Sequence, residues 1–479
     1  MSHLGNLLRP GSPKENRGAA RMFARDVQTL VPVWGELTTS EVRRVIGLVQ
    51  AAVKQSNPDL VELEGALAIL ACLLTGRRLK NIHQSRFTTA QRWPEEDPPP
   101  GLVRAADNCG WWLPAGKPSS APAEQYVWIP ATPLLTECLR IVTKLRAGPG
   151  DRTSLFTGSF QDVETAARNF LRAPHLRRAS TTLEAVQRWL EQKLTQVAGG
   201  DAAVAAILTA RTNNVVAKSP LHYTSCSQEK LTHFWWAATS ELRAELWVDK
   251  ERAAPPAIRA RRLGSTFCPL PQQMQDLRAR LIGEARRARS FADRSNAFVR
   301  YTAVLLSLGL TLRAAGRPIT VRQVPGNPDA VIVDDTRNED PMMTRLIWLA
   351  PIVRQQFETL ATHISNLGGA VMGDGTLPLA LIEGGTVQQA TLRDVLSGLP
   401  EVADKNLPIN FARHYVRSNL IGSCSTETLQ ALLGHWNSGT QPWGGASGLD
   451  PLLYRADLLR SLPDLLANDG WIPMSPPSP

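Results

Sequence analysis

The chain has 479 residues, enough for roughly two to four domains at about 100–200 residues each, and 43% of its residues are hydrophobic. It has no apolar run of about 18 residues, and its first residues lack the apolar core of a signal peptide, which argues against a membrane span or export and predicts a cytoplasmic protein. The formal charge of +10, carried mostly by arginine, favours a polyanionic partner but does not identify an activity.

The six cysteines are scattered and include no C-x-x-C pair. In a chain of this length that pattern predicts reduced, buried thiols and argues against a zinc cluster or a disulfide framework. The sequence also lacks the G-x-x-x-x-G-K-S/T pattern of a nucleotide-binding loop. We therefore expect neither a metal nor another cofactor. The cysteines are Cys72, Cys109, Cys138, Cys226, Cys268 and Cys424.

The first half begins with a basic segment rich in Gly, Pro and Asn, and residues 1–20 are therefore predicted to be a disordered leader. A first domain is expected over 21–250. Its predicted elements, in chain order, are a capping box from Thr38 to Glu41 before an apolar series, an apolar helix over 60–74, a hairpin formed by 111–113 and 126–129, and a helix over 182–194.

Residues 251–262 contain Pro255-Pro256 and are predicted to be a linker to a second domain over 263–470, followed by a disordered tail over 471–479. The elements expected in the second domain are helices over 276–289 and 298–312, strands over 330–333 and 345–349, and helices around 353–365, 388–397 and 410–421. The predicted fold class is mainly α with small β-hairpins or sheets, an α+β protein in two major parts.

One stretch carries a recognisable pattern. The sequence reads Asn410-Phe-Ala-Arg413-His414 at the start of a helix, then Leu432-Leu-Gly-His435, and later Tyr454. His435 follows Arg413 by 22 residues. The pattern resembles the C-terminal half of the tyrosine recombinase (phage integrase) catalytic domain, over about residues 270–465. It departs from that family where Asn410 replaces the first histidine and where 19 residues, more than the family's usual spacing, separate His435 from Tyr454.

The resemblance implies a site and a reaction. Tyr454 would attack a DNA phosphodiester, giving a 3′-phosphotyrosyl link and a free 5′ hydroxyl, with no metal or ATP. Arg313 and Arg413 would stabilise the charge on the phosphate oxygens, and His435 would add a third donor. Asn410 or His414 would fill the remaining motif position. Arg313 has the better helix register for the first arginine, and Arg317 is the alternative.

A lysine of the family's hairpin, which protonates the leaving oxygen, has no counterpart here, because no lysine occurs from 251 to 404. Arg337 lies in the corresponding turn but is a poor proton donor because of its high pKa. An alternative is therefore a catalytically inactive, recombinase-derived protein that binds DNA as an accessory factor. A further alternative is an unrelated helical interaction protein.

Several features of the first half recur in the second half at a similar spacing. Arg78 follows an apolar helix as Arg313 does, Lys117 lies in a predicted hairpin, and Tyr223 precedes Tyr454 by 231 residues. The second arginine of such a copy stays open: helix register places Glu184 there, whereas spacing favours Arg178. The first half is thus either a second, active or degenerate copy of the same domain or an unrelated DNA-binding arm.

The stretch from 251 to 294 has ten arginines and four acidic residues. Several of them, Arg278, Arg280, Arg286, Arg287 and Arg289, fall on or near one predicted helix. Such a run is either a solvated helix face or a contact to the DNA backbone. The expected partners are double-stranded DNA and, on the DNA, further copies of the chain or a partner recombinase; no membrane is expected.

Overall fold

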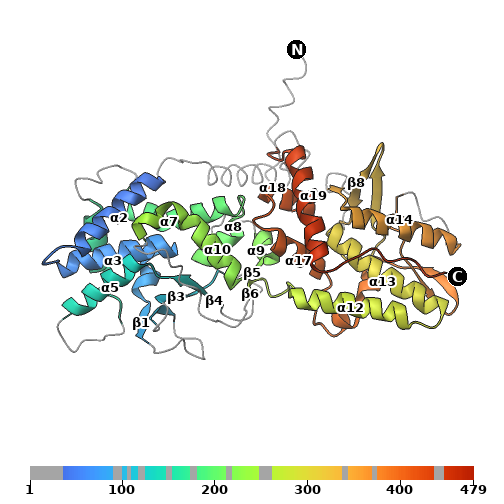
Figure 1. Cartoon of the computed structure of the whole chain (residues 1–479), viewed down its shortest axis with the longest axis horizontal. Coiled ribbons are helices and arrows are strands. Elements are labelled where there is room, and N and C mark those ends of the chain that lie inside the picture. Colours follow the sequence, from blue (N-terminus) through green and yellow to red (C-terminus); the bar gives the residue numbers. More distant parts are fainter. Residues whose placement is uncertain are drawn as a thin grey trace, which may run out of the picture. The chain divides into compact units, whose positions relative to one another are not determined.

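The computed structural model describes residues 36–89, 100–104, 109–116, 125–146, 154–172, 181–211, 218–246, 262–336, 344–368, 375–435 and 447–478. The predicted leader, Lys117, Arg178, Arg337 and all but the last residue of the predicted linker lie outside these ranges. The chain divides into two compact units. The first lies within Phe23–Thr266 and the second within Phe267–Pro479, coloured blue to green and yellow to red in Figure 1. Each is described below by itself.

Helices make up most of the first unit. The central one, α3 (Leu60–Thr75), is buried on nearly all sides, and α2, α5, α6 and α7 pack against it. The predicted capping box is confirmed at the start of α2, where Thr38 and Glu41 each bond the other's backbone. The remaining helices complete the set: α2 (Thr39–Val53), α4 (Leu79–His83), α5 (Pro133–Leu145), α6 (Phe160–Leu171), α7 (Leu183–Val197), α8 (Ala202–Thr209), α9 (Lys218–Tyr223), α10 (Gln228–Thr239), η2 (Ser240–Leu242) and α11 (Arg243–Leu246).

The first unit also holds a four-stranded sheet in the order β1-β2-β3-β4, with β1 parallel to β2 and the other pairs antiparallel. Its strands are β1 (Arg86–Thr89), β2 (Gly101–Arg104), β3 (Cys109–Pro114) and β4 (Tyr126–Pro130). The predicted hairpin is confirmed as β3 and β4, with Trp112 opposite Trp128. A separate pair joins β5 (Ser225–Ser227) to β6 (Arg262–Gly264), so residues just after the predicted linker still belong to the first unit.

In the second unit the apolar helix α13 (Phe291–Gly309) occupies the centre, and every residue from Tyr301 to its end is buried. It begins at Phe291 rather than at the expected Phe298, because Ser290 caps it by accepting from the backbone N–H of Asp293. The other helices are α12 (Pro271–Arg287), α14 (Pro351–Asn366), α15 (Leu392–Ser397), α16 (Pro400–Ala403), α17 (Phe411–Leu420), α18 (Thr426–Leu433) and α19 (Pro451–Asn468).

Two small antiparallel sheets complete the second unit. Strands β7 (Thr320–Val324), β8 (Asn327–Asp334) and β9 (Arg345–Trp348) form one, and β10 (Ala380–Glu383) and β11 (Thr386–Gln389) form a hairpin. The helix predicted over 388–397 therefore begins later, at Leu392, because residues 386–389 pair with β10 and Thr391 caps the helix. The whole is a mixed α+β fold with small sheets, as the sequence predicts.

The prediction of a disordered tail over 471–479 is wrong for its first residues, 471–474. Trp471 is 2% exposed, and the backbone N–H and C=O of Ile472 both bond the hydroxyl of Tyr301 on α13. The amide of Gln356 on α14 bonds the backbone of Met474 in the same way. The proline- and serine-rich composition suggested disorder, but a buried tryptophan and paired backbone groups hold the tail in place.

Among the described residues, no helix combines the length and the apolar character needed to cross a membrane. The prediction of buried thiols is confirmed for Cys72, Cys138, Cys226 and Cys424, whereas Cys109 and Cys268 are only partly buried.

Candidate functional site

The predicted site residues lie where three chain segments of the second unit meet. Helix α13 ends at Gly309, and Thr311 then turns the chain with a φ of +47°. Helix α18 ends at Leu433, and Gly434 follows with a φ of +64°. Helix α17 packs against both α13 and α18. Since helix ends leave backbone carbonyls without partners in the helix, this meeting point is rich in acceptors for arginine.

Arg413 lies on α17 and is fully buried. It donates from Nη1 to the carbonyl of Thr311 at 2.7 Å and from Nη2 to the carbonyl of Leu433 at 2.5 Å. Its Nη2 also lies 3.0 Å from Nε2 of His435. Arg413 thus ties the ends of α13 and α18 to α17. It also holds Thr311 in a left-handed conformation that a β-branched residue rarely adopts.

Arg313 approaches the same carbonyls from the other side. Its Nη2 donates to the carbonyls of Leu433 and Gly434, both at 3.2 Å. Its Nη1 pairs with Asp335 at 3.0 Å, and its side chain is 27% exposed. The two arginines that the resemblance selects therefore share one acceptor, Leu433, although 100 residues separate them in sequence.

Asp335 is the carboxylate at the centre of the cluster. It is buried, accepts from the backbone N–H of Arg313 at 2.7 Å and pairs with Arg345 at 2.5 Å. Burial alone would raise the pKa of Asp335, but the charges of Arg345, Arg313 and Arg413 outweigh it and hold the pKa below the usual value. Asp335 is therefore ionised at neutral pH and fixes the side chain of Arg313.

Arg345, at the start of β9, is completely buried. Besides Asp335 it donates to the carbonyls of Leu310 and Leu432 and to the hydroxyl of Thr311. The sequence analysis took Arg345 only as the first residue of a strand and missed its role. The available signal was its position: it shares the inward face of β9 with Ile347, where a charged residue needs a partner.

His435 directly follows the left-handed Gly434. Burial lowers its pKa well below the usual value, and the charges of Arg413, Arg417, Arg313 and Arg345 lower it further. The imidazole is therefore neutral at pH 7. Its Nε2 faces Arg413 and acts as the acceptor, so the ring's proton is assigned to Nδ1.

An open hollow of about 440 Å³ lies beside Arg313. Arg317 and Arg393 line it together with Asn410, whose side-chain oxygen accepts from the backbone N–H of Ala314 at 3.0 Å. Arg317 pairs with Asp334 at 3.0 Å and donates to the carbonyl of Thr336. Of the two candidates, Arg313 and not Arg317 bonds the carbonyl of Leu433 that Arg413 also bonds.

Tyr454 lies on α19 and is 1% exposed. Its hydroxyl donates to the carbonyl of Leu346 on β9 at 2.7 Å, and burial raises its pKa above the usual value. Helix α19 contacts α17, α18 and β9, which places the tyrosine next to the site's scaffold. It is not among the residues that line the hollow beside Arg313.

Two neighbours on α17 differ in their surroundings. His414 is buried, and its ring lies 5.6 Å from that of Phe267. Arg417, one turn after Arg413, is 1% exposed and acts on the pKa of His435. The sequence analysis did not select Arg417, although the spacing of four residues places both arginines on one helix face.

The first unit has a partial counterpart of this site. Arg77 donates to the carbonyl of Leu208 at 2.7 Å, and Arg211 donates to the carbonyl of Gly76, also at 2.7 Å. Arg211 lies 4.0 Å from Glu191. Arg78, the residue that the sequence analysis selected, is exposed at the start of α4, and Tyr223 is half-buried at the end of α9.

The arginines on and near α12 have divergent contacts. Arg278 bonds the carbonyl of Gly470, and Arg280 pairs with Glu284 and Glu401. Arg287 bonds the carbonyl of Gly283 on its own helix, whereas Arg286 and Arg289 are exposed. At least two of the five therefore hold the unit's own chain together.

Comparison with protein-family models, with curated proteins and with solved structures found no match to this chain. Among the described residues, no group of three or more His, Cys, Asp or Glu side chains could hold a metal ion.

Proposed function

We propose that the chain is a divergent tyrosine-recombinase-like protein that binds double-stranded DNA and cuts and rejoins it through a 3′-phosphotyrosyl link at Tyr454. The observation that carries the proposal is that Arg313 and Arg413 share the carbonyl of Leu433 as an acceptor, and that Arg413 also contacts His435. These residues were selected from the sequence pattern alone, and their convergence is what a phosphate clamp built from separate helices requires.

The charge around the hollow supports a phosphate ligand. Arg313, Arg317 and Arg393 line it, while its one buried acid, Asp335, is shared with Arg345. The surplus positive charge lies beside Asn410, a neutral donor and acceptor. A phosphodiester in the hollow would meet Arg313 first, because Arg313 is partly exposed and Arg413 lies fully buried behind the shared carbonyl.

Cleavage adds a requirement at Tyr454. In the described conformation its hydroxyl is buried and donates to Leu346, and attack on phosphorus needs that oxygen to reach the phosphate as a nucleophile. The reaction therefore requires α19 to shift so that Tyr454 leaves the carbonyl of Leu346. A general acid for the leaving 5′ oxygen would have to come from a group other than a lysine of residues 251–404.

A second candidate is a DNA-binding protein that has lost cleavage and acts beside an active partner. The observation that favours it is the same burial of Tyr454, combined with the absence of that lysine. This protein would keep the arginine-lined hollow and its salt-dependent affinity for DNA, and would never become covalently attached.

The first unit is, in this proposal, a degenerate second copy of the same domain. In both units an apolar helix is contacted by the helix before it and by several later ones: α2, α4, α5, α6 and α7 around α3, and α12, α14, α15 and α17 around α13. In both, a turn with positive φ follows that helix, at Gly76 and at Thr311. The short helices α8 and α18 are each followed by another such residue, Ala210 and Gly434.

The counterpart site lacks the paired arginines. Arg211 occupies the position that His435 has in the second unit and itself reaches the carbonyl of Gly76, beside Glu191. Glu184, the helix-register match to Arg413, pairs with Arg168 instead. The carboxylates of Glu191 and Glu184 would repel a phosphate at this site, so we assign any cleavage to the second unit.

A nicked suicide substrate tests the proposal. The resemblance to integrases implies that the chain serves a mobile DNA element. The substrate therefore carries the ends of that element, and wild type is compared with Tyr454→Phe and Tyr223→Phe. We expect a covalent adduct that only Tyr454→Phe abolishes. DNA binding without any adduct would support the non-catalytic candidate, and loss of the adduct only in Tyr223→Phe would transfer the activity to the first unit. Failure to bind duplex DNA at low salt would overturn both candidates.

A further inference from the structure

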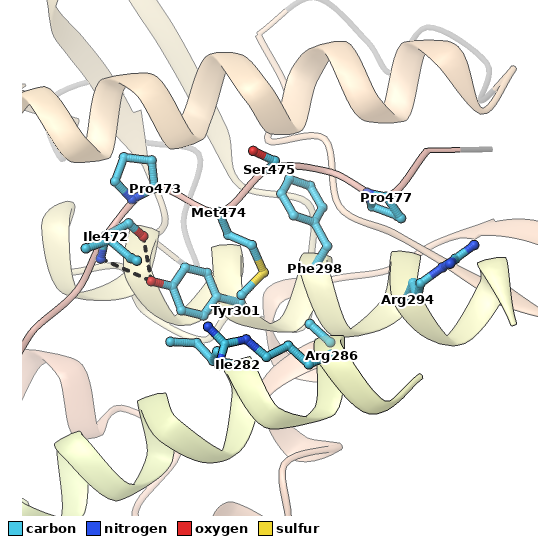
Figure 2. Close-up of a pocket in the computed structure, with 11 residues that line it drawn as sticks. Ile282, Arg286, Arg294, Phe298, Tyr301, Ile472, Pro473, Met474, Ser475 and Pro477 are labelled. Carbon is cyan, nitrogen blue, oxygen red and sulfur yellow. Dashed lines mark hydrogen bonds between the residues drawn. The ribbon is translucent and has the colours of Figure 1, made fainter. Parts of the chain in front are cut away.

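A second hollow in the same unit lies between the C-terminal tail and the helices α12 and α13. It has a volume of about 330 Å³ and a mostly apolar lining (Figure 2). Ile282 and Phe298 contribute from the helices, and Ile472, Pro473 and Met474 from the tail. The volume falls at the lower end of the range of roughly 300–1,000 Å³ found for small-molecule sites.

The tail wall of this hollow is fixed by hydrogen bonds. The hydroxyl of Tyr301 accepts from the backbone N–H of Ile472 at 3.2 Å and donates to its carbonyl at 2.6 Å. Gln356 accepts from the N–H of Met474 at 2.7 Å. Figure 2 shows the side chain of Met474 pointing toward α13 between Tyr301 and Phe298. The hollow is therefore a preformed space, which reduces the entropic cost of binding a ligand.

Two arginines give the apolar hollow a positive charge. Arg286 lies below Tyr301, and Arg294 lies toward Pro477 (Figure 2). No acidic residue is among the lining residues, and within the described parts of the chain neither guanidinium pairs with a carboxylate. Nε of Arg294 is buried and has no hydrogen-bond partner there. A buried donor without a partner costs free energy, which an anionic group placed beside it would recover.

We propose that this hollow is a binding site for a small apolar carboxylate, such as a medium-chain fatty acid, with the carboxylate on Arg294 and the apolar part against Phe298 and Met474. The charge selects an anion and the lining selects an apolar body. This site is separate from the arginine cluster around Asp335, and the inference does not depend on the DNA-binding proposal.

Titration calorimetry on the full chain tests this inference with decanoate as the probe and decanol as its neutral analogue. We expect saturable binding of one decanoate per chain and clearly weaker binding of decanol. Arg294→Gln should weaken decanoate binding by roughly tenfold or more, the usual effect of losing a charge-assisted hydrogen bond. Arg289→Gln, an exposed arginine of the same segment that does not line the hollow, should leave binding unchanged.

A second variant tests whether the probe occupies the hollow. Ala285 lines the hollow, so Ala285→Phe should fill part of it and abolish decanoate binding while the arginines stay in place. Equal affinity for decanoate and decanol, or decanoate binding that neither Arg294→Gln nor Ala285→Phe weakens, would overturn the proposal. Circular dichroism of each variant verifies that it is folded.

Discussion

Neutralising Asp335 should strongly destabilise the second unit. The carboxylate is 2% exposed and pairs with Arg345, which is 0% exposed, at 2.5 Å. Two opposite charges about 4 Å apart attract by about 4 kcal/mol at an effective dielectric constant of about 20. Removing one partner of a buried pair leaves the other charge uncompensated, which typically costs about 3–5 kcal/mol. We therefore expect Asp335→Asn to lower the free energy of unfolding by about that amount.

A double-mutant cycle separates the ion pair from the surrounding packing. Arg345→Met alone should lower the free energy of unfolding by a similar amount. It removes the buried partner of the Asp335 carboxylate, whose remaining ion pair is with the partly exposed Arg313. The double variant removes both charges and their desolvation, so its loss should fall well below the sum of the two single losses, with a coupling energy of about 3 kcal/mol. Urea unfolding, followed by circular dichroism and by tryptophan fluorescence, measures each value.

The same variants have a predicted pH dependence. The folded pKa of Asp335 lies below the ordinary value of about 3.9, because the neighbouring arginines outweigh burial. Its stabilisation is therefore fully present above that ordinary value and is lost as the pH falls through the folded pKa. The difference between wild type and Asp335→Asn should be constant near neutral pH and shrink below about pH 4. Strictly additive losses in the cycle, or a difference that does not change in acid, would refute the reasoning.

Three further variants test the site. Arg313→Gln should weaken binding to duplex DNA and reduce the slope of log affinity against log salt by about 1. Arg354→Gln, which removes a comparable ion-paired arginine, is the control and should change neither value. Equal effects of the two variants would argue against a phosphate at Arg313. Gly434→Ala should lower the free energy of unfolding by at least about 1–2 kcal/mol, because φ is +64° and the added Cβ would lie 2.8 Å from Cδ of Arg345. The control is Gly448→Ala, whose added Cβ would lie in open space. Equal stabilities of the two variants would contradict the prediction. Tyr454→Phe should cost about 1–3 kcal/mol in urea unfolding, since it leaves the carbonyl of Leu346 without its donor, and an unchanged midpoint would show that this bond contributes little.

The sequence by itself determined the local structure where apolar residues and caps agree. Leu60–Thr75 is almost uniformly apolar and ends at a glycine, and the structure places α3 there. The capping box of α2 and the pairing of β3 with β4 depend on neighbouring residues, so the sequence pattern was sufficient for both. The motif that begins at Asn410 likewise located α17, although the helix α18 was not predicted and the choice between Arg313 and Arg317 stayed open.

Only the tertiary structure decided which side chains meet. Arg345 and Asp335 lie in separate segments, and they pair because both are buried at the ends of α13 and α18. Tyr454 was selected from its place in the motif, yet packing of α19 directs its hydroxyl to the carbonyl of Leu346. The tail has the composition of a disordered segment but is held by Tyr301 and Gln356, far away in sequence. Each contact satisfies a buried polar group with a distant partner, and no local pattern encodes that choice.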